Sequence, residues 1–350
     1  MYNTVILIDS GIDTNLYKKN IVGGICFSYE SGKVTKSSNY FDKNGHGTAC
    51  ACVISSISKD TNFYVIKVLN NKAKTSMELL IAALEYCSTL KYKIINLSLA
   101  TIDSSNIHDL KKICEKLKDQ GKLIISSVFN RHTTSYPASF DSVLGVRGGI
   151  LSEDDSFWFN PKYEIECVAN IIPQFTKRSL NNYMLFGGNS KACAYMSGYI
   201  MNIIKDTNIC EIDKIKSILQ KCSTKYQWRE DDINTSITWP FFKYDSERTY
   251  AKSQLERIKT SLYKVNPASA ISYLGWNDNL YEKKIVTPNN CKAIIENLEE
   301  EYNSRINDNY INFFSFFTVK SLLELVREEK NKNGKKFEIN KRDVPAYKGL

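Results

Sequence analysis

The first 125 residues alternate short apolar runs with amphipathic helical patterns. The apolar runs are typical of strands buried on both faces and cover residues 5–8, 63–69, 94–99 and 123–125. Between them, residues 75–90 and 106–121 repeat apolar side chains at helical spacing, and Thr75 with Glu78 forms a predicted capping box. This alternation predicts an α/β fold, a mostly parallel sheet with helices on both sides.

Sheets of this kind carry their sites at the carboxyl ends of the strands. Asp9 directly follows the first run, and Ser98 lies near the end of the third. Asn130 lies shortly past the fourth. We therefore expect these polar residues, far apart in the sequence, to meet at one edge of the sheet.

The composition limits the classes of partner. The chain has 350 residues, 43% of them hydrophobic, which suits either one large domain or one domain with a smaller one. A net charge of +9 comes without any nucleic-acid-binding motif. We therefore expect no nucleic-acid partner, and interpret the charge as a solvated basic face or an attraction to an acidic peptide.

Cysteine usage and the amino-terminal segment bear on the compartment. The chain has ten cysteines but no C-x-x-C motif, which favours buried free thiols in a reducing compartment and no zinc site. The first residues lack a secretory-signal pattern, and no apolar run is long enough to span a bilayer. The sequence therefore predicts a cytoplasmic protein without a membrane partner.

Three short polar motifs carry the chemistry, at residues 9–11, 44–48 and 188–190. They supply an aspartate, then His46, then Ser190, which is one of the known chain orders of the Asp-His-Ser triad. A serine hydroxyl is a weak nucleophile, so an imidazole must accept its proton and a carboxylate must orient that imidazole. The alternative for Ser190 is an ordinary helix N-cap.

Five stretches together resemble the subtilisin-like serine proteases, the subtilases of peptidase family S8. They are VILIDSGID, DKNGHGTACA, INLSLA, FNRHTTSYPAS and GGNSKACAYMSG, and the resemblance covers roughly residues 1–225. It implies a subtilisin-like three-layer fold with a mostly parallel sheet. It also implies a serine endopeptidase that works through an acyl-enzyme.

The resemblance assigns roles to single residues of this chain. Asp9, His46 and Ser190 would form the catalytic triad, and Asn130 would help to bind the oxyanion. Three consecutive residues would lie beside the backbone of the bound peptide: Ser98, Leu99 and Ala100. The family needs no cofactor for catalysis, and structural calcium, which often stabilises its members, cannot be assigned to any loop here.

Several positions depart from the family pattern. Asn189 stands where the family usually has threonine, Lys191 where it has methionine, and Phe129 and Ala100 where it has glycine. These departures leave two interpretations open. The first is an active endopeptidase, and the second is a catalytically weak or inactive subtilase-fold protein that binds peptides.

Residues 226–350 are predicted to form a separate, mainly helical accessory region, with helical patterns at 289–302 and 318–330. Its end faintly resembles a carrier protein, with the attachment serine at Ser321, and the alternative is a plain helical appendage. We expect the region to brace the protease domain, cover its site or recruit a partner. A cytoplasmic subtilase with such a region would suit maturation of a specific peptide, such as a leader-bearing precursor.

Overall fold

The computed structural model divides the chain into two compact units. The residues that it describes are 3–129, 135–151, 156–179, 182–233, 250–267, 269–287, 290–307 and 311–330. The first unit contains residues 1–172, 177–181 and 187–233, and the second contains 173–176, 182–186 and 234–350. The division after residue 233 lies close to the boundary near residue 225 that the sequence predicts. The second unit also includes two earlier strand segments, residues 173–176 and 182–186.

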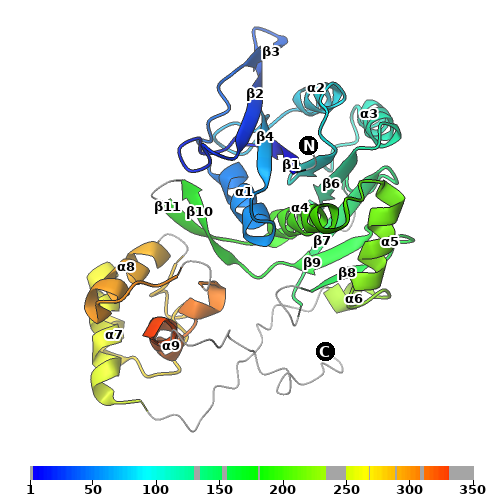
Figure 1. The fold of residues 1–350 in the computed structure, drawn as a ribbon. Coiled ribbons are helices and arrows are strands. Elements are labelled where there is room, and N and C mark those ends of the chain that lie inside the picture. Colours follow the sequence, from blue (N-terminus) through cyan, green and yellow to red (C-terminus); the bar gives the residue numbers. More distant parts are fainter. Residues whose placement is uncertain are drawn as a thin grey trace. The chain divides into compact units, whose positions relative to one another are not determined.

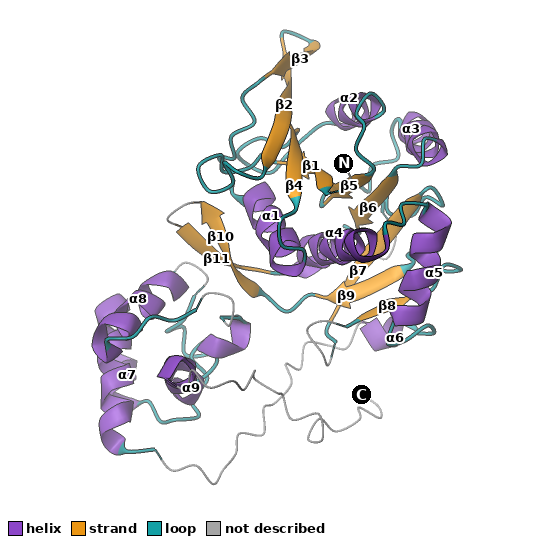
Figure 2. Cartoon of the chain, in the orientation of Figure 1, coloured by secondary structure: helices purple, strands orange, loops and turns teal. Residues whose placement is uncertain are grey.

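A nine-stranded sheet forms the centre of the first unit (Figures 1 and 2), with the strand order β3-β2-β4-β1-β5-β6-β7-β9-β8. All neighbouring strands are parallel except for the two outermost pairs, β2–β3 and β8–β9. The strands are β1 (Thr4–Asp9), β2 (Ile21–Glu30), β3 (Lys33–Ser37), β4 (Asn62–Lys67), β5 (Ile94–Leu97), β6 (Leu123–Ser127), β7 (Val143–Gly149), β8 (Phe157–Phe159) and β9 (Cys167–Asn170). The predicted mostly parallel α/β fold is confirmed.

Helices cover both faces of this sheet. On one face, α2 (Met77–Cys87) and α3 (Ile107–Asp119) share an apolar core with β1 and β4, and on the other α1 (His46–Ile57) packs beside α4 (Gly188–Thr207) (Figure 1). The helices α5 (Ile212–Cys222) and α6 (Glu230–Ile233) follow. The predicted cap at Thr75 is wrong, because Ser76 is the N-cap of α2 and its side chain accepts the Leu79 N–H. None of the described helices is long and apolar enough to cross a membrane.

The register of the central strands determines where the polar residues meet. Ile8 of β1 pairs with Leu97 of β5 in a parallel ladder. Asp9 and Ser98, the next residue of each segment, therefore stand beside one another at the carboxyl edge of the sheet. Every residue of β1 and β5 is buried, so this edge is held by a rigid, fully packed core.

The second unit has its own apolar core. It is built around α7 (Lys252–Val265), α8 (Cys291–Tyr302) and α9 (Val319–Lys330), with the short helices η1 (Ser269–Tyr273) and η3 (Phe313–Phe316). A hairpin of β10 (Gln174–Ser179) and β11 (Asn182–Phe186) also contributes, through Phe175 and Tyr183, whose rings stack at 4.8 Å. The mainly helical character predicted for this part of the chain is present.

Ser321 has a local structural role at the start of α9. Its hydroxyl donates to the Thr318 carbonyl and accepts from the Thr318 N–H, each at 2.8 Å. The Thr318 hydroxyl in turn accepts the Ser321 N–H at 3.1 Å. The two side chains therefore cap the helix reciprocally.

The contact between α1 and α4 leads to a stability prediction. A Cβ atom at Gly198 would lie 2.9 Å from both the Ile54 carbonyl oxygen and the Ile57 Cβ. We expect Gly198→Val to destabilise the fold by about 1–3 kcal/mol, because the close approach leaves no room for a branched side chain. Urea unfolding should show a lower midpoint for this variant.

Lys205→Val is the matched control, because it places the same residue at an exposed position of α4. Its midpoint should change little. An equal decrease of the urea midpoint in both variants would contradict a steric cause at Gly198.

Candidate active site

A hydrogen bond joins the buried Asp9 to the half-buried His46. The His46 Nδ1 lies 2.8 Å from Oδ1 and 3.0 Å from Oδ2 of Asp9. Asp9 is fully buried at the end of β1, whereas the His46 side chain is 23% exposed at the start of α1. Burial alone would lower the pKa of His46, but the negative charge and hydrogen bond of Asp9 raise this pKa well above its usual value of 6.5.

The buried carboxylate of Asp42 shapes the loop that carries His46. Its Oδ1 accepts the Asn44 and Gly45 N–H groups at 3.0 and 2.7 Å and the Ser10 hydroxyl at 2.9 Å. Its Oδ2 accepts the N–H and hydroxyl of Thr48 at 2.9 and 2.7 Å. These five bonds tie the histidine loop to the residue that follows Asp9, so that the two motifs have a fixed separation.

Ser190 lies in the first turn of α4, and this turn faces the end of β5. Its hydroxyl donates to the Ser98 carbonyl at 3.3 Å, and the Ser98 hydroxyl donates back to the Ser190 carbonyl at 3.3 Å. The N-cap of α4 is Gly187, so Ser190 is not the N-cap of this helix. Because Ser98 stands beside Asp9 in the register, Ser190 and the Asp9–His46 pair are placed at the same edge of the sheet.

Asn189 joins two further strand ends to the turn before Ser190. Its Oδ1 accepts the Gly148 N–H at 2.8 Å and its Nδ2 donates to the Val128 carbonyl at 2.9 Å. Val128 follows β6 and Gly148 lies in β7. Asn189, which departs from the family pattern, thus fixes the turn through both the oxygen and the nitrogen of its side-chain amide.

The other expected substrate-site residues have different environments. Ser98 is buried, while Leu99 and Ala100 are half-buried. Phe129 is 41% exposed beyond β6, and its N–H donates to the Ser135 hydroxyl at 2.8 Å. Asn130, the expected oxyanion residue, lies outside the described residues.

Cys50 adds a thiol to the Asp9–His46 pair that sequence reasoning missed. Its Sγ lies 3.6 Å from the Asp9 Oδ2 and 3.8 Å from the His46 Nδ1. Burial raises the pKa of this thiol, so it stays neutral beside the carboxylate. Within the described part of the chain, these three side chains form the single group whose metal-ligating atoms all lie within 4.8 Å of one another.

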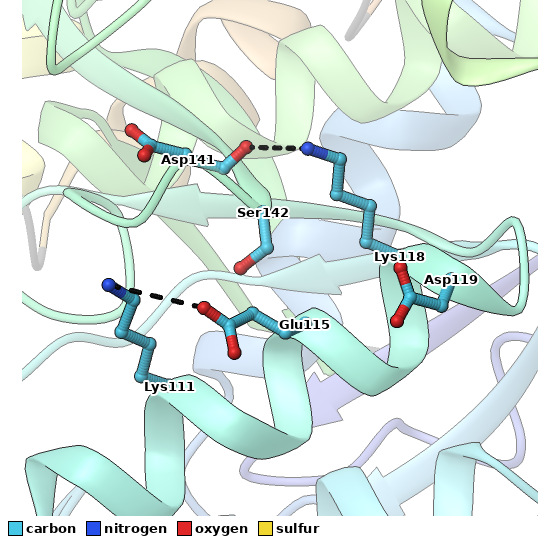
Figure 3. A pocket seen from close by; sticks show the side chains of 6 residues that line it. All are labelled: Lys111, Glu115, Lys118, Asp119, Asp141 and Ser142. Atoms are coloured by element: carbon cyan, nitrogen blue, oxygen red, sulfur yellow. Dashed lines mark hydrogen bonds and ion pairs between the residues drawn. The ribbon is translucent and has the colours of Figure 1, made fainter.

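A surface pocket of about 290 Å³ lies apart from these residues, between α3 and the start of β7 (Figure 3). Lys118 Nζ donates to the Asp141 carbonyl at 3.3 Å, and Lys111 pairs with Glu115 at 4.0 Å. No residue of the three polar motifs lines it. Its lining is Lys111, Glu115, Lys118, Asp119, Asp141 and Ser142.

Comparison with known proteins identifies the family. The model of the Subtilase family matches residues 3–237, more than half of the chain. The chain belongs to the subtilase family. It is accordingly a serine endopeptidase, a hydrolase that cuts peptide bonds.

The relatives are distant. Subtilisin DY of Bacillus licheniformis is 24% identical over 233 residues, which cover 62% of this chain and 82% of that protein. The major intracellular serine protease of Bacillus subtilis (strain 168) is 26% identical over 216 residues, covering 55% of this chain and 66% of that protein. The solved structure of a cold adapted subtilisin-like serine proteinase covers 65% of this chain and 86% of its own, with a TM-score of 0.52 at 17% identity.

The electrostatics of the subtilase site lead to a prediction for His46. In the wild-type protein its imidazole should titrate above 6.5. Asp9→Asn removes the charge that raises this pKa and leaves burial, which lowers it, so the titration should move to lower pH. NMR titration of the His46 ring measures both values.

Asp141→Asn is the control for this titration, because Asp141 is exposed and lies outside the three polar motifs. The His46 pKa should be the same in this variant as in the wild type. An unchanged His46 pKa in Asp9→Asn would contradict the proposed electrostatic cause.

Proposed function

We propose that this subtilase cleaves its substrate with Ser190 as the nucleophile, His46 as the general base and Asp9 as the residue that orients His46. At a pH above the raised pKa of His46 the imidazole is neutral, and the Ser190 Oγ then attacks the peptide carbonyl carbon while its proton passes to the His46 Nε2. The Asp9 carboxylate holds Nδ1–H and stabilises the imidazolium that forms. His46 then gives this proton to the departing amine, and the acyl group remains on the Ser190 oxygen.

Hydrolysis of the acyl-enzyme uses the same groups in reverse. A water molecule loses a proton to His46 as its oxygen attacks the ester carbon. When the Ser190–carbon bond breaks, His46 returns the proton to the serine oxygen and the acid product leaves. No redox step is involved, and atoms and protons balance over the cycle.

The oxyanion of each tetrahedral intermediate needs hydrogen-bond donors. The Ser190 N–H, in the first turn of α4, is one proposed donor, and the Asn130 side chain is the other. The positive end of the helix dipole favours negative charge at this place. By analogy with a measured subtilisin, loss of the side-chain donor would lower turnover by about 10²–10³.

The observation that carries this proposal is the partly buried Asp9–His46 hydrogen bond at the strand edge where Ser98 holds Ser190. In the free protein the Ser190 hydroxyl donates to a carbonyl, so it must turn toward His46 before attack. A hydroxyl held by one long bond of 3.3 Å can make that change at little cost.

We further propose a cytoplasmic maturation role, in which the protease cuts a specific peptide such as a leader-bearing precursor. Similarity to a relative that is named as an intracellular serine protease supports the compartment. A second unit with its own apolar core supports a recognition element beyond the protease fold, through which a partner could bind.

The nucleophile can be tested by labelling with a fluorophosphonate, which reacts with serines activated by an assembled triad. The wild-type protein should be labelled at Ser190, as mapped by peptide mass spectrometry, and Ser190→Ala should not be labelled at all. Ser105→Ala, which changes an exposed serine, is the control and should label like the wild type. A folded wild-type protein that stays unlabelled would overturn the assignment.

The maturation role requires a separate comparison. Cleavage of a leader-bearing precursor should be faster by orders of magnitude than cleavage of an unrelated unfolded protein. Equal rates for the two substrates would indicate a general protease and would contradict the maturation role.

A further inference from the structure

Three chain segments are linked beside His46. Arg178 of the β10–β11 hairpin donates from Nε to the Asn44 carbonyl at 2.7 Å. The Asn44 side chain donates from Nδ2 to the Asn71 carbonyl at 2.9 Å and accepts the His46 N–H at 3.2 Å. Asn44 therefore connects the hairpin, the histidine loop and the turn at residues 70–74.

The stem of Arg178 packs over the backbone that leads into His46. A Cβ atom at Gly45 would lie 2.0 Å from the Arg178 Cγ, and Gly45 has a φ of +94°. The residue therefore has to be glycine, and the arginine stem occupies the place of its missing side chain. With Nε bonded to Asn44, the two Nη groups of the exposed guanidinium remain for a ligand.

Lysines extend this positive charge along the same segments. Lys43 precedes Asn44, and Lys72 and Lys74 lie in the turn whose backbone is held by Asn70, with Oδ1 accepting their N–H groups at 2.9 and 3.2 Å. All three lysines are exposed. We call Arg178, Lys43, Lys72 and Lys74 the basic rim.

The acids near the basic rim do not pair with it in the part of the chain that the structure describes. None of its four cations forms an ion pair there. The carboxylates of the histidine loop region, Asp9 and Asp42, are buried and bonded within the loop network. Glu78, the next exposed acid along the chain from Lys74, lies in the first turn of α2 beside Ser76.

We propose that the basic rim binds acidic side chains of the substrate next to the scissile bond, with Arg178 as the main specificity residue. The proposal rests on the peptidase function given above. His46 has to lie against the scissile bond to protonate the leaving amine, so the cations around its loop flank the peptide there. The guanidinium of Arg178, braced by Asn44, can take a carboxylate through its paired Nη groups.

The test uses pairs of fluorogenic peptides that differ by Asp against Asn at each position flanking the scissile bond. At about 10 mM salt the wild type should favour the Asp peptide by about tenfold in kcat/KM at one or more positions. The ratio should shrink at about 1 M salt, where the screening length falls from ~30 to ~3 Å. Arg178→Glu should reverse the ratio, and Arg178→Lys should keep part of it.

The ratio of kcat/KM for the two peptides is taken within one variant, so effects of the substitution on folding and on overall turnover cancel. If Arg178→Glu does not fold, Lys72→Glu reports on the same rim through the same ratio. Arg305→Glu is the matched control, because the Arg305 side chain is 93% exposed in the second unit, and it should keep the wild-type ratio. Equal cleavage of both peptides, or a ratio that Arg178→Glu leaves unchanged, would overturn the inference.

Binding separates this inference from the proposed function. The Ser190→Ala variant should bind the Asp peptide about tenfold more tightly than the Asn peptide by calorimetry, whether or not the wild type cleaves either. Tight binding of the acidic peptide without cleavage by the wild type would refute the catalytic assignment and leave the basic rim intact. Cleavage without any acidic preference would refute the basic rim and leave the catalytic assignment intact.

Discussion

The site depends on the buried carboxylate of Asp42. Asp42 accepts five hydrogen bonds from the histidine loop and from Ser10. A buried charge is stable in a protein when donors replace the water that it has lost, and here those donors are the backbone and hydroxyl groups of two catalytic motifs. The same bonds that satisfy Asp42 therefore set the distance between Asp9 and His46. Removing the carboxylate would leave several buried N–H groups without an acceptor, and the loop would lose its shape.

The sequence could predict the central strands because they are buried on both faces and form continuous apolar runs. It could not predict β7, because Gly145 and Arg147 interrupt the apolar pattern there. Arg147 is tolerated because it pairs at 2.7 Å with Glu230, a residue 83 positions further along the chain. Such a long-range ion pair has no local signal. The cap of α2 was misplaced by one residue because Thr75 and Ser76 are adjacent cap-forming residues, and serine, the better cap of the two, is the one that accepts the Leu79 N–H.

The β10–β11 hairpin shows a similar limit for the site. Its first strand is mostly polar and its second is mostly apolar, which gives no regular alternation, yet the hairpin contributes to both units. Phe175 and Tyr183 belong to the apolar core of the second unit, while Arg178 belongs to the first and bonds to Asn44. The order of the three motifs along the chain was enough to propose the Asp9–His46 pair. A contact between an exposed arginine and a loop 134 positions away could not be read from spacing.

The departure at Asn189 is better explained as a different way to fix the nucleophile turn than as a lost function. An amide carries a donor and an acceptor at separate atoms, so Asn189 can hold the Val128 carbonyl and the Gly148 N–H together. A threonine hydroxyl has one oxygen for both tasks and could not reach two strand ends at once. Gly148 has no room for a side chain, because a Cβ there would lie 1.9 Å from the Ile171 side chain and 2.7 Å from the Asn189 Oδ1. Asn189 and Gly148 are thus complementary, and together they clamp β6 and β7 to the turn that presents Ser190.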